Sequence, residues 1–255
     1  MLAGDTKDER LQATPWLVGG LYRVGMPSRL VAVSFDAHDP ARLAAFWAGV
    51  LGREVVRKAD GALLPRDDSQ VGLRFVAAAT ERSGPNRLHL HLTSSTLEDQ
   101  RHTVQRVLAL GGRHVDVGQL PEEDHIVMAD PEGNELCVIE PDNSFLAGCG
   151  FLGEVSCDGT REVGLFWRDA LQWRLVWDQD EETAIQSPSG GTKVSWGGPP
   201  VAPKEGRNRQ RLHLAAPDLP AEVERLVALG ANELGERDGG FELADPDGNE
   251  FSLVP

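Results

Sequence analysis

Apolar and polar positions near the start of the first half of the chain follow two different periods. Residues 30–35 form a short run rich in β-branched and aromatic side chains, which favours a strand. Residues 41–51 place apolar side chains at the three- to four-residue spacing of a helix. Asp39 and Pro40 are typical of a helix start, because Asp caps free backbone N–H groups and Pro fits the first turn. Gly52 marks the predicted end of this helix.

The same order returns further along the chain. Leu88–Leu92 alternates leucine with histidine, which predicts a half-buried strand, and residues 97–110 return to the helical period. Two short apolar runs at 126–128 and 136–139 flank the turn-forming segment Asp130–Asn134. The pattern therefore predicts strand–helix–strands, followed by strand–helix–strands. Two such halves can pair into one curved, mostly antiparallel sheet with helices on its outer face.

The second half of the chain repeats the first. Five short blocks recur in the same order roughly 120 residues later, a period far above the 20–50 residues of solenoid repeats. The matching blocks are Val33–Asp36 with Val155–Asp158, Phe46–Trp47 with Phe166–Trp167, Arg87–Leu90 with Arg211–Leu214, Leu108–Gly111 with Val227–Gly230, and Asp130–Glu135 with Asp245–Glu250. We predict an N-terminal extension at residues 1–28 and two whole domains at residues 29–142 and 149–255.

Composition narrows the range of partners. The chain has 255 residues, with 25 Lys and Arg against 40 Asp and Glu, a net charge of −15 and no basic cluster. Nucleic acids and anionic membranes are bound by concentrated positive charge, so neither is an expected partner. The sequence contains neither a signal-peptide pattern nor an apolar stretch of about 18 residues. The three cysteines lack a paired spacing. We expect a cytoplasmic protein whose cysteines are reduced.

The repeated blocks resemble a known superfamily. Asp36–Trp47 with Leu51–Gly52, Arg87–Leu90 and Asp130–Cys137 are similar to the vicinal oxygen chelate superfamily, which includes glyoxalase I, extradiol dioxygenases and the bleomycin and fosfomycin resistance proteins. The resemblance is closest to glyoxalase-like domains, over residues 30–141 and more weakly 150–255. It implies an α+β fold of tandem glyoxalase-like domains, each made of two paired βαβββ modules that form a curved, mostly antiparallel sheet around a cavity. This fold hosts many reactions and some pure binders.

The resemblance also implies positions for a metal site. Metal-dependent members bring four ligands into the cavity, one from the first and one from the last strand of each module. Carried onto this chain, these positions fall on His89 in the first domain and His213 in the second. The usual last-strand glutamate falls on Cys137 and Ser252, and a first-strand position falls on Ala32. We therefore expect no complete metal centre, even if one domain borrows ligands from the other, because the second copy supplies only His213 and Ser252.

His89 and His91 are the main candidates for chemistry. They are two residues apart, so on a strand they face the same side, and the neighbouring leucines place that side toward the cavity. Two imidazoles near Cys137 suit a soft transition metal, or they act as acid and base near neutral pH. We expect no cofactor; a divalent transition metal held by His89, His91 and Cys137 is the alternative. We expect His125 to lie at the surface or a strand edge.

Five further residues are candidate ligand contacts. Arg74 fixes an anionic group if it points inward from the last strand of the first module, and is otherwise solvated. Trp173, Trp177 and Trp196 are candidates to line an aromatic cavity that stacks a planar ligand. His213 repeats the position of His89 in the second domain.

The sequence leaves three functions open. The leading hypothesis is a monomer or homodimer that binds a small organic molecule in a sheet cavity, without a complete metal site. The first alternative is a metal-dependent lyase or dioxygenase with a divergent centre around His89. The second is a metal-free isomerase or hydrolase that uses His89 as general base. The identity of the ligand and the active domain do not follow from the sequence.

Overall fold

The helices and strands follow the predicted periods. The computed structural model describes residues 27–79, 84–120 and 122–255. The first repeat contains β1 (Arg29–Ala37), α1 (Pro40–Leu51), β2 (Val56–Lys58), β3 (Gly61–Leu64), β4 (Gly72–Ala77), β5 (Leu88–Leu92), α2 (Leu97–Ala109), β6 (Arg113–His114), β7 (Ile126–Ala129) and β8 (Glu135–Val138). The second contains β9 (Leu152–Cys157), α3 (Arg161–Leu171), β10 (Arg174–Gln179), β11 (Glu182–Gln186), β12 (Lys193–Trp196), β13 (Gln210–Ala215), α4 (Leu219–Leu229), β14 (Asn232–Arg237), β15 (Gly240–Ala244) and β16 (Glu250–Val254). Each repeat therefore consists of two βαβββ modules.

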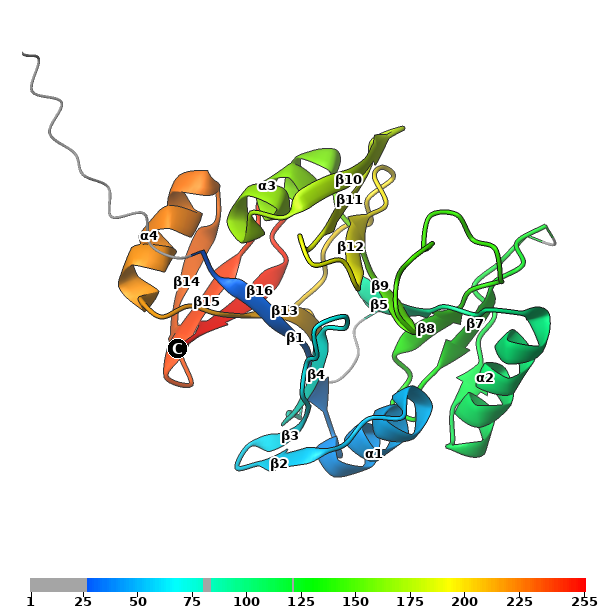
Figure 1. The fold of residues 1–255 in the computed structure, drawn as a ribbon. Helices are drawn as coiled ribbons and strands as arrows, with labels where there is room; N and C mark the ends of the chain where they lie inside the picture. The colour runs from blue at the N-terminus through cyan, green and yellow to red at the C-terminus, as the bar shows by residue number, and fades with distance from the viewer. Residues whose placement is uncertain (1–26, 80–83, 121) are drawn as a thin grey trace, which may run out of the picture.

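The strands form two sheets of eight strands each (Figure 1). Sheet A has the order β14-β15-β16-β13-β1-β4-β3-β2, and sheet B has the order β10-β11-β12-β9-β5-β8-β7-β6. Most neighbours are antiparallel; the first and last strand of each module are parallel. The predicted α+β class and the mostly antiparallel sheets are confirmed.

The pairing of modules differs from the prediction that the two modules of one repeat form one sheet. β1 pairs with β13 and β5 pairs with β9, so each sheet joins one module of the first repeat to one module of the second. The modules of one repeat meet through their helices instead, since α1 packs against α2 and α3 packs against α4. The first strand of every module is thereby left to pair with the other repeat.

A repeated Trp–Asp hydrogen bond links the two modules of each repeat. Trp47 Nε1 on α1 donates a hydrogen bond to Asp130 Oδ2 at 3.2 Å, across two modules. Trp167 Nε1 on α3 makes the same bond to Asp245 Oδ2 at 3.1 Å. Both tryptophans are buried, so each bond also satisfies a buried indole N–H group.

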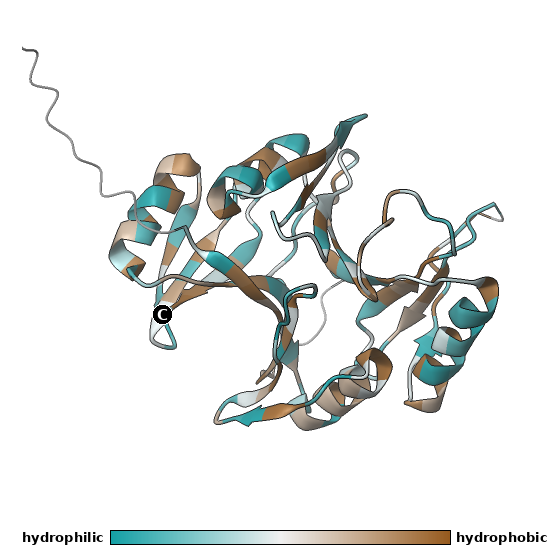
Figure 2. Ribbon diagram, viewed as in Figure 1, coloured by the Kyte–Doolittle hydropathy of each residue, from teal (hydrophilic) through white to brown (hydrophobic). Residues whose placement is uncertain are grey.

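Helix ends and the core follow the sequence pattern. Asp39 caps α1 by accepting a hydrogen bond from the Arg42 backbone N–H at 3.0 Å, and Gly52 ends the helix in the left-handed region. In Figure 2, α2, α3 and α4 carry both brown and teal segments, as expected of helices with one buried and one solvent-facing side. Among the described residues no helix combines the length and apolar character needed to span a membrane.

Sheet B carries an additional small core on the face opposite its helices. Leu146, in the segment that connects the two repeats, is buried against Val127, Cys137 and Ile139. Thr93 holds the end of this segment through a backbone bond to the Phe151 carbonyl at 2.9 Å. The connecting segment therefore lies across sheet B, on the face that we call concave.

Candidate functional site

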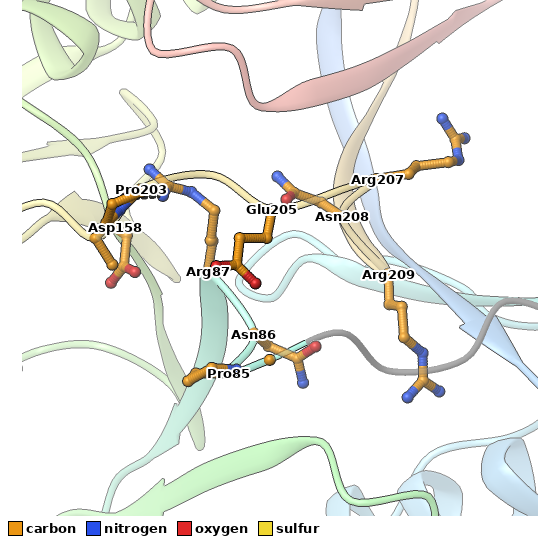
Figure 3. Close-up of a pocket in the computed structure, with 11 residues that line it drawn as sticks. Pro85, Asn86, Arg87, Asp158, Pro203, Glu205, Arg207, Asn208 and Arg209 are labelled. Carbon is orange, nitrogen blue, oxygen red and sulfur yellow. Dashed lines mark hydrogen bonds between the residues drawn. The ribbon is translucent and has the colours of Figure 1, made fainter.

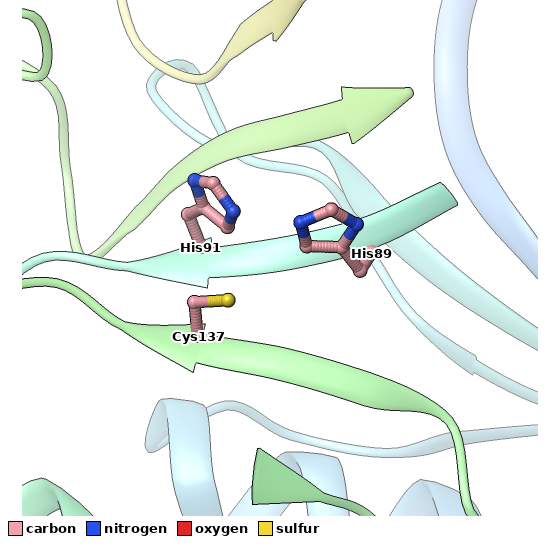
Figure 4. Close-up of side chains that lie close together, drawn as sticks. All are labelled: His89, His91 and Cys137. Carbon is pink, nitrogen blue, oxygen red and sulfur yellow. The ribbon is translucent and has the colours of Figure 1, made fainter. Parts of the chain in front are cut away.

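Strand β5 brings the two predicted histidines to the concave face of sheet B. Leu88, Leu90 and Leu92 are buried in the main core, and the histidines between them project to the opposite side. Cys137 on the adjacent strand β8 is in register with His91. One ligand atom from each of His89, His91 and Cys137 lies within 4.8 Å of the others, with the thiol directed toward the two rings (Figure 4).

A carboxylate from the second repeat completes this cluster. Glu154 on β9 is in register with His91, and its Oε2 lies 2.5 Å from His91 Nδ1. Its other oxygen accepts a hydrogen bond from the Ser195 hydroxyl on β12. Glu154 is not among the groups that the sequence predicts from the second copy, and the structure places it against His91. The blocks beginning at Val33 and Val155 correspond to each other, so Glu154 occupies in the second repeat the position that Ala32 occupies in the first. The sequence therefore contained a signal for this residue.

The cluster separates the charge states of its two histidines. Burial opposes protonation of His91, but Cys137 and Glu154 together outweigh this effect and raise its pKa well above the usual value. Burial alone would raise the pKa of Glu154, but the bond to His91 lowers it below the usual value. Burial and the neighbouring His91 lower the pKa of His89 to about 4. Near neutral pH the structure therefore holds a buried His91–Glu154 ion pair beside a neutral His89.

A cavity of about 380 Å³ opens beside this cluster. His91 and Glu154 line one side of it, and Phe145 and Trp177 supply aromatic surface. The rings of Phe145 and Trp177 meet edge to face with centroids 5.6 Å apart. The cavity is concave, partly aromatic and supplied with converging polar groups, as small-molecule sites are.

Comparison with known families identifies the fold. The model of the glyoxalase-like domain family matches the chain twice, at residues 32–139 and 154–254. The chain belongs to the glyoxalase-like domain family. A search of curated protein sequences found no match.

Solved structures agree with this glyoxalase-like fold. The chain is similar to glyoxalase I from Zea mays, with 13% identity, a TM-score of 0.63, and coverage of 89% of this chain and 92% of that chain. It is also similar to a putative dioxygenase from Bacillus subtilis subsp. subtilis strain 168, with 12% identity, a TM-score of 0.58, and coverage of 90% of this chain and 85% of that one. At such low identity these likenesses show the shared fold alone.

The other candidate residues of this glyoxalase-like protein lie partly in the core and partly at the sheet B cavity. Trp196 is 1% exposed, its ring stacks on Trp167 in the core with centroids 6.4 Å apart, and it also lines the sheet B cavity. Trp173 packs at the edge of the main core and lines a separate small hollow. His125, expected at the surface or a strand edge, directly precedes β7, is half-buried and lines the sheet B cavity with His91. Trp177 and Trp196 are thus two tryptophans of the second repeat that line this cavity.

Sheet A presents a different concave face. His213 is buried at 8% exposure and its Nδ1 has no hydrogen-bond partner. Arg74 lies near it and makes an ion pair with Asp60. The registered neighbours of His213 are Ala32 on β1 and Ser252 on β16, which supply no further metal ligand. Burial, followed by the charges of Arg74 and Arg211, lowers the pKa of His213 to about 4.

A third hollow, of about 220 Å³, is lined by three arginines (Figure 3). The guanidinium groups of Arg207 and Arg209 point away from that of Arg87 in this view. Arg207 pairs with Glu242, and Arg209 pairs with Glu132 at 3.2 Å. Because these positive charges diverge and two are neutralised, the hollow does not present a converging anion site.

Proposed function

We propose that this glyoxalase-like protein binds a small organic molecule in the sheet B cavity. The observation that carries the proposal is the cavity itself, which combines the Phe145 and Trp177 rings with the polar His91–Glu154 pair. Its volume of about 380 Å³ lies within the range of small-molecule sites. The aromatic rings supply contact area, and the polar pair orients a ligand.

Thermal-shift screening of aromatic metabolites and antibiotics tests this function. A ligand at 100 times its dissociation constant adds about 2.7 kcal/mol of stability. We expect the shift to be lost in Trp177→Leu and retained in Trp173→Leu, since Trp173 lines a separate hollow. A flat melting temperature across a broad library, or equal loss in both variants, would contradict the proposal.

A metal-dependent reaction at the same site is the second candidate. It is favoured by the closeness of His89, His91 and Cys137, and by His91 Nε2, which is buried without a hydrogen bond. His91 Nδ1 bonds to Glu154, the arrangement by which carboxylates orient metal-binding histidines. Two imidazoles and a thiolate suit Zn²⁺, Co²⁺ or Ni²⁺. A bound ion would supply a Lewis acid for a substrate oxygen.

Metal analysis of protein purified without an affinity tag tests this candidate. We expect about one equivalent of transition metal per chain if the candidate is correct. Titration with Co²⁺ should give a thiolate-to-metal absorption band that Cys137→Ser removes and Cys149→Ser keeps. Absence of both the metal and the band from the wild-type chain would reject a metal centre and leave the ligand-binding proposal standing.

A further inference from the structure

We propose that the ligand of the sheet B cavity is a planar organic cation. This inference rests on the ligand-binding function proposed above and specifies the chemical class of the ligand. It follows from the charges that line the cavity and from the kind of aromatic surface beside them.

The charged side chains around the cavity are predominantly acidic. Among the described residues that line it there are three glutamates and no lysine or arginine. Glu154 is neutralised by His91. Glu140 accepts a hydrogen bond from the Asn143 side chain at 2.6 Å, and neither it nor Glu182 forms an ion pair within the described part of the chain. Two carboxylates thus remain available to attract a positive charge.

The aromatic rings of the cavity also favour a positively charged ligand. Trp177 presents the ring type that interacts best with cations, and Phe145 lies against it. Lys193 Nζ already lies 4.5 Å from the Phe145 ring centroid, where it also donates to the Phe145 carbonyl oxygen. Phe145 therefore binds a cation within the protein itself. Lys193 does not line the cavity, and among the described residues it forms no ion pair with Glu140 or Glu182.

The net charge of the whole chain also favours a cationic ligand in this cavity. The net charge of −15 produces a negative field, and a concave site whose carboxylates outnumber its cations concentrates that field. The hollow near Arg87 is lined by three arginines and lacks aromatic residues. Within the described structure, acidic groups and aromatic rings meet at the sheet B cavity.

Calorimetric titration with three probes of similar shape tests the inference: N-methylquinolinium as cation, quinoline as neutral compound and 1-naphthoate as anion. At pH 7.5 and low salt we expect N-methylquinolinium to bind at least about tenfold more tightly than quinoline, and 1-naphthoate to show no binding. Raising the salt concentration should weaken the cation several-fold and leave quinoline unchanged.

Variants of the two free carboxylates locate the effect. Glu140→Gln and Glu182→Gln should each weaken N-methylquinolinium about three- to tenfold without changing quinoline binding. Glu236→Gln, which removes the same charge from the exposed strand β14, is the matched control and should change neither. Equal or tighter binding of quinoline or 1-naphthoate would overturn the cation class and leave ligand binding intact. Failure of N-methylquinolinium to bind would also overturn the proposed cationic class of the ligand. The proposal that the cavity binds a small organic molecule is contradicted only by a negative result in the broad thermal-shift screen.

Discussion

Sheets A and B have the same topology but different concave faces. Three positions related by the repeat carry the contrast: Ala32 with Glu154, His213 with His89, and Ser252 with Cys137, the sheet A residue first in each pair. In sheet B these residues form a cluster of imidazole, thiol and carboxylate groups. In sheet A the isolated His213 lies near arginines instead. One architecture thus holds two faces of different chemistry, and the cavity walled by Phe145 and Trp177 lies over sheet B.

The route of the chain contributes to this difference. The segment between the repeats runs from β8 to β9, which flank β5 in sheet B. Helices pack on the other face, so the segment crosses the concave side and brings Phe145 and Leu146 over it. Sheet A contains no corresponding crossing, because β1 and β16 are the first and last strands described. The connection between the repeats therefore covers sheet B, and no such connection crosses sheet A within residues 27–79, 84–120 and 122–255.

The largest expected difference concerns an aspartate at the junction of the repeats. Asp36 in sheet A accepts two hydrogen bonds from buried Arg211, at 2.9 and 2.6 Å. Its counterpart Asp158 makes no ion pair within the described residues, and Arg87 donates to Asn249 instead. Asp36→Ala should cost about 3–5 kcal/mol in urea unfolding, because it leaves a buried cation unpaired.

Asp158→Ala provides the comparison and should cost less than about 1 kcal/mol. Burial raises the pKa of Asp158 against the smaller effect of Arg87, so its charge is poorly stabilised. The double variant Asp36→Leu/Arg211→Met should recover most of the stability lost in Asp36→Ala, since no unpaired charge remains. Similar losses of unfolding free energy for Asp36→Ala and Asp158→Ala would show that the two aspartates do not differ in this way.

A pH-dependent loss of stability should mark the cationic face of sheet A. The pKa of His213 is about 4 when folded, owing to burial, then Arg74 and Arg211, with Asp60 opposing, and about 6.5 when unfolded. Between these values the unfolded chain binds more protons, so stability falls as pH falls, by about 3 kcal/mol at pH 4. Urea unfolding from pH 7.5 to 4 should show this loss reduced in His213→Gln. The exposed His38→Gln should retain it, and an unchanged profile in His213→Gln would refute the assignment.

Removal of the buried Trp–Asp bonds should affect both repeats alike. Trp47→Phe and Trp167→Phe each leave a buried aspartate without one donor and should cost about 2 kcal/mol. Trp173→Phe, which loses no hydrogen bond, is the control and should stay within about 0.5 kcal/mol. Thermal and urea unfolding measure these differences. A strong effect in one repeat alone would show that the two are not fastened in the same way.

The smallest expected effects concern the N-terminal caps of α2 and α4, the helices of the second module in each repeat. Thr96 caps α2 through the Asp99 N–H group at 3.0 Å, and Asp218 caps α4 through the Ala221 N–H group at 3.3 Å. Thr96→Ala and Asp218→Ala should each cost about 1 kcal/mol. Equal values in urea unfolding would show that the sheets differ on their concave faces and not in the helices that cover them.

The sequence by itself determined the modules, their duplication and the side on which His89 and His91 project. Alternation, helical spacing and turn residues are local properties, so they can be recognised without knowledge of the whole fold. The tertiary structure decided which modules share a sheet, and it thereby placed Glu154 against His91 and the connecting segment over sheet B. Strand partners lie far apart in the chain, and their choice depends on helix packing and burial summed over the whole molecule, which no local pattern records.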